Sequence, residues 1–173
     1  NPLLILLGFH LVQYLAIPVF PLYYVHALEI GDQQIALGSA IFYLTVLLGS
    51  TQLVRLAGRL GHKRVTAFGV MLMSIYPILL AFSHSLGLFL VTSAVGGIAW
   101  ALTGGAIINY LLEVVPQHDR PAHLAWYNLV LNFGILAGSL LGPLIAGSLG
   151  LFTALLVFGL LRLVAGLAML RWG

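Results

Sequence analysis

The sequence has no cysteine and very few charged residues. Of its 173 residues, 6% are Asp, Glu, Lys or Arg and 61% are hydrophobic, against roughly 25% and 45–50% in soluble domains. So few charged side chains cannot cover the surface of a water-soluble protein of this size, and we therefore expect lipid to be the outer solvent. The absence of cysteine excludes disulfides and thiol chemistry.

Acidic residues and metal-ligand patterns are also scarce. The chain has four Asp and Glu residues, none of them in the middle of an apolar run. No paired carboxylates and no metal-binding histidine spacing occur, so we expect no enzymatic activity, no metal and no other cofactor. The net charge of +3 comes from too few groups to form a nucleic-acid surface.

Six apolar runs have the length that a membrane-spanning helix needs, about 20 residues. They cover residues 3–25, 34–56, 65–82, 86–112, 122–145 and 151–170. Their side chains do not alternate between polar and apolar, as the strands of a membrane barrel would. The connections are short, so we predict an all-α, polytopic membrane protein with one six-helix bundle over residues 1–173.

The Lys and Arg residues of the connections indicate the orientation of this bundle. The connections after the second and fourth runs and the end of the sixth are basic, and the other connections have no Lys or Arg. Basic connections face the cytoplasm, so we expect both termini to be cytoplasmic and the bundle to lie in the plasma (inner) membrane. The chain begins with Asn1 rather than Met; we expect a piece of a longer protein, without a signal peptide.

The most basic segment reads VRLAGRLGHKR over residues 54–64. It resembles the signature loop between the second and third helices of major facilitator superfamily transporters, Gly-x-Leu-Ala-Asp-Arg-x-Gly-Arg-Lys/Arg. Val54 replaces the first glycine of that pattern and Gly58 replaces its aspartate. The residues of interest in this loop are Arg55, Gly58, Arg59, Gly61, Lys63 and Arg64.

A second resemblance lies in the fifth run, which reads GILAGSLLGPLIAG over residues 134–147. Gly134, Gly138 and Gly142 recur every four residues, so they share one helix face and permit close approach of another helix. Pro143 removes one helical hydrogen bond and can kink the span. The pattern is similar to the glycine-rich fifth helix of the same superfamily.

The resemblance implies one six-helix half of a secondary transporter, which moves a small molecule by rocker-type alternating access. The fourth run has no Arg, unlike the N-terminal half of many proton-coupled members. Together with the degenerate loop, this favours the C-terminal half; the N-terminal half of a uniporter-like member is the alternative. The expected partners are the lipid bilayer, a second six-helix half in the same or another chain, and an unidentified substrate, with no nucleic acid.

Polar residues of the first, fourth and fifth runs are the candidates for a substrate cavity. His10, Gln13 and Tyr14 are spaced to share one helix face, and unpaired polar groups are costly in hydrocarbon. We expect this face to point at the cavity that the resemblance implies, or at a neighbouring helix. The further candidates are Trp100, Thr103, Asn128 and Asn132.

Two charged residues stand apart from the basic loop. Glu113 ends the fourth run on the basic side, and we predict that it pairs with Arg55 or Arg59 in one conformation as a latch, although Gly58 removes the acid that the superfamily uses there. Arg162 lies within the sixth run. If that helix faces lipid, as the resemblance implies, Arg162 must snorkel to the interface or pair.

Other functions fit less well. An aquaporin-like channel needs two Asn-Pro-Ala motifs and a rhomboid-type protease needs Gly-x-Ser-Gly, and neither pattern is present. The remaining alternative is a non-transporting accessory subunit of a larger membrane complex, because one six-helix half has no second wall for a cavity.

Overall fold

The computed structural model describes residues 2–173, and it is helical almost throughout. The predicted all-α fold with six membrane-spanning segments is confirmed. The helices are α1 (Pro2–Ala16), α2 (Val19–His26), α3 (Asp32–Leu60), α4 (His62–Ala81), α5 (Leu86–Val114), the short 3₁₀ helix η1 (Gln117–Asp119), α6 (Arg120–Leu149) and α7 (Leu151–Trp172). Each span is longer than the apolar run that was predicted for it, because the helix continues beyond the hydrocarbon core into a polar end.

The first span is divided into α1 and α2 by a break at Pro18. Proline has no N–H and cannot donate to the carbonyl four residues earlier. The last turn of α1 is correspondingly loose, with Ile17 N donating to Gln13 O at 3.3 Å. Pro21 does not break the chain again, because it lies in the first turn of α2, where an N–H has no helical partner.

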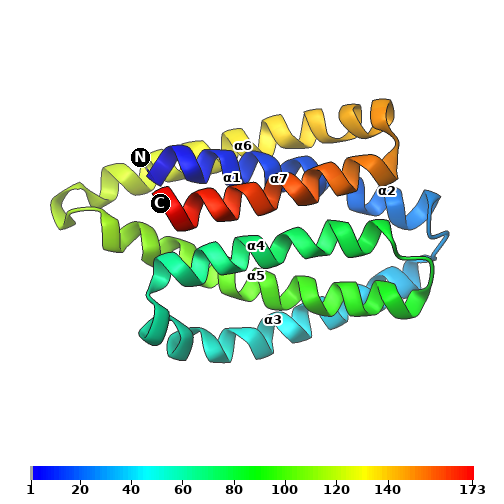
Figure 1. Cartoon of the computed structure of the whole chain (residues 1–173), viewed down its shortest axis with the longest axis horizontal. Helices are drawn as coiled ribbons and strands as arrows, with labels where there is room; N and C mark the ends of the chain where they lie inside the picture. The colour runs from blue at the N-terminus through cyan, green and yellow to red at the C-terminus, as the bar shows by residue number, and fades with distance from the viewer. Residues whose placement is uncertain (1) are drawn as a thin grey trace.

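The helices pack in an order that relates the first three spans to the last three (Figure 1). α5 packs against both α3 and α4, while α1 packs against both α6 and α7. The contact between α4 and α7 joins these two sets of helices. The second span, α3, thus lies on the fourth span, α5. In the same way the fifth span, α6, lies on the first span, α1. Both ends of the described chain lie at one end of the bundle, together with the α3–α4 and α5–α6 connections.

Two one-residue turns show the same relation in the sequence. Gly61 joins α3 to α4 with φ 79° and ψ 154°, and Gly150 joins α6 to α7 with φ 82° and ψ 150°. Each is the last residue of a similar segment, AGRLG over residues 57–61 and AGSLG over 146–150. Each glycine N–H also donates to the carbonyl four residues earlier at 2.9 Å. A positive φ strains any residue with a Cβ, so glycine is needed at both turns.

The glycines of α6 bring that helix close to α1. A Cβ atom at Gly138 would lie 2.6 Å from the carbonyl carbon of Tyr14, and one at Gly134 would lie 2.9 Å from the Cβ of His10. Gly142 faces the backbone of Leu15 in the same way. Small residues at such a contact allow extensive backbone packing, which holds membrane helices together without a hydrophobic drive.

Candidate binding pocket

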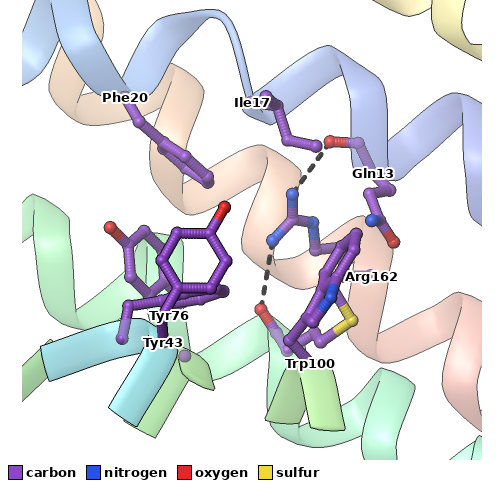
Figure 2. A pocket seen from close by; sticks show the side chains of 10 residues that line it. Gln13, Ile17, Phe20, Tyr43, Tyr76, Trp100 and Arg162 are labelled. Atoms are coloured by element: carbon purple, nitrogen blue, oxygen red, sulfur yellow. Dashed lines mark hydrogen bonds between the residues drawn. The ribbon is translucent and has the colours of Figure 1, made fainter. Parts of the chain in front are cut away.

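A pocket of about 310 Å³ lies near the middle of the bundle (Figure 2). It is bordered by the first span and by α3, α4, α5 and α7. Its lining residues are Gln13, Ile17, Phe20, Phe42, Tyr43, Met73, Tyr76, Gly96, Trp100 and Arg162. The walls are largely aromatic, with one cationic side chain.

Arg162 points from α7 into the interior, and only 2% of its surface is exposed. The condition under which Arg162 was expected to snorkel or pair, a lipid-facing position, does not apply, because the side of α7 that carries it packs against α1 and α4. Its Nη1 donates to the backbone oxygen of Met73 at 3.2 Å, and its Nη2 donates to that of Gln13 at 2.8 Å. These bonds, seen as dashed lines in Figure 2, tie three spans together.

Prolines explain why these carbonyls accept from a side chain. Pro77 lies inside α4 and cannot donate to Met73 O, its partner in a regular helix. Arg162 supplies that missing hydrogen bond. Gln13 O lies at the loosened end of α1, one turn before the break at Pro18. It accepts a long hydrogen bond from Ile17 N, and Arg162 donates a second, shorter one. An unsatisfied carbonyl in hydrocarbon costs several kcal/mol, so we interpret the arginine as a replacement donor for Met73 O and as an additional donor for Gln13 O.

Aromatic side chains complete the pocket. The guanidinium carbon of Arg162 lies 5.5 Å from the centroid of the Phe20 ring, within the range of a cation–π interaction. The hydroxyls of Tyr24 and Tyr76 are 2.5 Å apart and share a hydrogen bond. Tyr43 and Trp100 lie at the open side, where their surfaces are 69% and 37% exposed.

The structure brings two of the predicted cavity residues, Gln13 and Trp100, to this pocket. His10 does not line it. It is buried between α1 and α6, beside Gly134 and edge-on to the Tyr127 ring at 5.5 Å. Tyr14 also lies on the side of α1 that meets α6, where its backbone contacts Gly138. The shared face of this helix therefore divides between the pocket and a helix–helix contact.

The other predicted cavity residues lie elsewhere. Thr103 is buried between α5 and α4 beside Gly69, and its hydroxyl donates to Ala99 O at 3.1 Å. Asn128 and Asn132 are exposed on α6, and the Asn132 side chain donates to Asn128 O at 2.7 Å. These polar groups satisfy part of their hydrogen-bonding capacity within their own helices, and none of the three lines this pocket.

Several lining residues were not anticipated from the sequence. Phe20, Phe42 and Met73 are apolar and look like any core residue, so no signal separates them from their neighbours. Tyr43 and Tyr76 carried a weak signal, because a tyrosine within a span needs a partner or a cavity for its hydroxyl.

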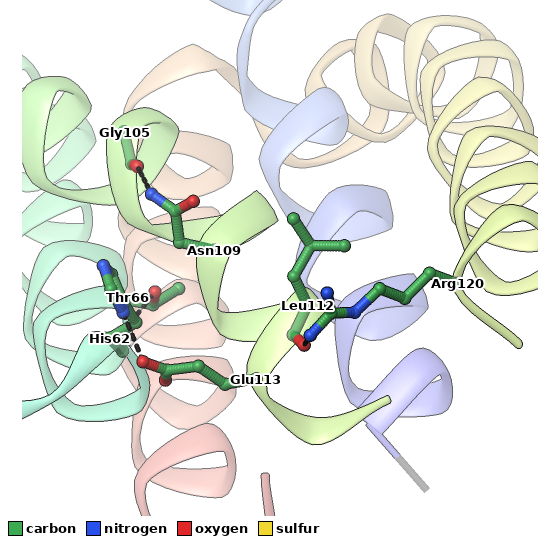
Figure 3. A network of polar contacts seen from close by, with 7 residues as sticks. All are labelled: His62, Thr66, Gly105, Asn109, Leu112, Glu113 and Arg120. Carbon is green, nitrogen blue, oxygen red and sulfur yellow. Dashed lines mark hydrogen bonds and ion pairs between the residues drawn. The ribbon is translucent and has the colours of Figure 1, made fainter. Parts of the chain in front are cut away.

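The basic end of the bundle carries a second polar cluster (Figure 3). Glu113 is paired there with His62, whose Nδ1 donates to Glu113 Oε1 at 2.5 Å. The predicted partners Arg55 and Arg59 are exposed, and Arg55 donates to Gln52 at 3.4 Å instead. His62 is the first residue of α4. The turn at Gly61 therefore places the His62 ring closer to the end of α5 than Arg55 and Arg59 are on α3.

Two further features of this end follow from the basic loop and the next connection. A Cβ at Gly58 would meet no atom within 4 Å, so the missing acid leaves open space. Lys63 and Arg64 lie in the first turn of α4. In the next connection, Arg120 donates to Leu112 O at 2.9 Å and thereby caps the end of α5 (Figure 3).

Six spanning helices, an internal pocket and a buried arginine define a polytopic helical membrane protein. The sequence model of the Major Facilitator Superfamily matches residues 3–173, so the chain belongs to that superfamily. This confirms the resemblance stated above from the basic loop and the glycines of the fifth span.

Individual relatives are similar over part of their length. Quinolone resistance protein NorA of Staphylococcus aureus strain MRSA252 is 26% identical over 146 residues, which is 84% of this chain and 36% of NorA. The protein of the same name in strain N315 is 25% identical over the same extent. Probable anion transporter 3, chloroplastic, of Oryza sativa subsp. japonica is 33% identical over 102 residues, 58% of this chain and 20% of that protein. The chain thus spans about a third of the NorA relatives it matches.

Proposed function

We propose that this chain is one six-helix half of a secondary transporter, which moves a small molecule by rocker-type alternating access. The observation that carries the proposal is the pocket. It lies near the middle of α4, α5 and α7, where Met73, Trp100 and Arg162 reach it. Superfamily membership over residues 3–173 supports the same function. A buried arginine at this depth is costly to maintain, and substrate binding gives a reason for it.

A second six-helix half would complete the transporter. Tyr43 and Trp100 are partly exposed at the open side of the pocket, and a facing half would cover them. The alternative, a non-transporting accessory subunit, requires no pocket that opens midway along the spans. The pocket therefore favours transport over a structural role.

The orientation and the latch belong to the same proposal. The end that carries the basic loop faces the cytoplasm under the positive-inside rule, and both termini lie on that side in the plasma (inner) membrane. The His62–Glu113 pair is the latch of this conformation, and the predicted Glu113–Arg55 or Glu113–Arg59 pair belongs to the opposite one. The substitution at Gly58 and the absence of Arg in the fourth span favour the C-terminal half.

Thiol labelling tests alternating access directly. This chain has no cysteine, so one cysteine at position 100 (W100C) is the only thiol of this six-helix half, and any cysteine elsewhere in the full-length protein is replaced first. In sealed vesicles of both orientations, we expect membrane-impermeant maleimide to reach it from either side. The control is V164C, at an exposed apolar site of α7, which we expect to be labelled from neither side. Labelling of W100C from one side only, whatever compound is added, would contradict alternating access.

The substrate requires a screen. NorA is named for quinolone resistance, so quinolones are the first compounds to test in flux assays on the full-length protein. We expect W100A to lower the flux of any transported compound more than W126A does, because Trp126 lies near the basic end of α6 and outside the pocket.

A further inference from the structure

We propose that the pocket binds aromatic organic anions, with the Arg162 guanidinium holding the anionic group. This inference rests on the proposed function and names its substrate class. Two features of the pocket carry it: a buried positive charge without a counter-ion, and unpaired hydrogen-bonding atoms beside it.

The charge of Arg162 has no acidic partner in this chain. The four acidic residues, Glu29, Asp32, Glu113 and Asp119, all lie at helix ends or in connections. Within residues 2–173, no carboxylate forms an ion pair with Arg162. A buried charge is stable only when it is paired or solvated, so an anion in the pocket would be bound more favourably than a neutral compound of the same shape.

The existing bonds of Arg162 orient the guanidinium without neutralising it. Its two acceptors are neutral backbone carbonyls, and the Phe20 ring adds only the attraction of its face. A guanidinium has five N–H donors, and the Nε of Arg162 is buried without a partner. The group is therefore fixed in place, still fully charged, with donors to spare for a carboxylate.

Gln13 adds an acceptor to the same pocket. Its side-chain Oε1 is buried and has no hydrogen-bond partner in the described structure, and Figure 2 shows this side chain next to Arg162. A ligand that places an N–H or O–H donor beside its anionic group would satisfy both residues. The aromatic walls of Phe42, Tyr76 and Trp100 suit a planar ring system.

The test compares three probes of nearly the same shape: naphthalene-2-carboxylate, naphthalene-2-carboxamide and 2-naphthylmethylammonium. Affinities are measured by isothermal titration calorimetry on the full-length protein in detergent. We expect the carboxylate to bind at least tenfold more tightly than the carboxamide and the ammonium compound to bind most weakly. R162Q should remove the preference for the carboxylate. R171Q, at the exposed end of α7, should retain it.

Q13E covers the outcome in which R162Q fails to fold. This nearly isosteric change places a carboxylate beside Arg162, so we expect the protein to fold with a raised melting temperature and to lose carboxylate binding at least tenfold. Equal affinity of the wild-type protein for the carboxylate and the carboxamide would overturn the proposal, as would an undiminished preference in Q13E or in folded R162Q.

The outcomes also separate this proposal from the proposed function. Two-sided labelling of W100C without preference for the carboxylate would refute anion binding and leave transport in place. Carboxylate preference with one-sided labelling would support the anion site and refute alternating access.

Discussion

Replacing Gly138 by alanine tests the contact between α1 and α6, which fixes the position of the first span. A Cβ at this position would lie 2.6 Å from the carbonyl carbon of Tyr14 and 2.8 Å from the N of Leu15. Both are backbone atoms, so no side-chain rotation can relieve the overlap. To restore an ordinary contact of 3.4 Å, the two helices must separate by about 0.8 Å.

Gly147 provides the matched control on the same helix. It is exposed, and a Cβ there would meet no atom within 4 Å. Alanine favours the helix over glycine by up to about 1 kcal/mol at either position. Overpacking of a tight contact costs about 1–3 kcal/mol. Because the gain in helix propensity is common to both variants, their difference isolates the overlap, and we expect G138A to be less stable than G147A by about 1–3 kcal/mol.

The free energies of unfolding are measured by titrating the purified proteins in mixed micelles with sodium dodecyl sulfate and following the loss of helix by circular dichroism. Equal midpoints for G138A and G147A would mean that α6 does not approach α1 as closely as described. The assignment of His10 and Tyr14 to a helix–helix contact would then be wrong as well.

Three further substitutions test other parts of the structure. Because Gly150 has φ 82°, we expect G150A to cost about 1–3 kcal/mol in the same titration; an unchanged midpoint would contradict the one-residue turn. E113Q removes a partly exposed pair with His62 and should change stability by less than about 1 kcal/mol, yet shift the inside-to-outside labelling ratio of W100C. An unchanged ratio would exclude the latch. Y24F removes the hydroxyl bonded to Tyr76 and should lower stability by about 1 kcal/mol; Y76F should lower it at least as much, because the Tyr76 hydroxyl also interacts with Ser93.

The basic loop and the glycines of the fifth span could be interpreted from sequence because their roles depend on local pattern. Gly61 belongs to a signature that ends one helix and begins the next, and it forms a one-residue turn of positive φ. Gly134, Gly138 and Gly142 share a face at every fourth residue, and that face meets α1. Spacing along one helix is enough to predict such features.

The pocket could not be predicted in the same way. His10, Gln13 and Tyr14 share a helix face by spacing, yet Gln13 borders the pocket and His10 packs against α6. A face of that width contacts two neighbours, and the rotation of α1 about its axis decides which residue meets which. The break at Pro18 and the close approach of α6 set that rotation, and both are properties of the assembled bundle.

The sequence by itself determined that this is a membrane protein with six helical spans, because hydrocarbon imposes a minimum apolar length on every span. Only the tertiary structure decided the role of Arg162. α7 is apolar on nearly every side, so its sequence contains no periodicity that assigns Arg162 to lipid or interior. Its direction depends on carbonyls of α1 and α4 near Pro18 and Pro77, which adjoin α7 only when the helices pack.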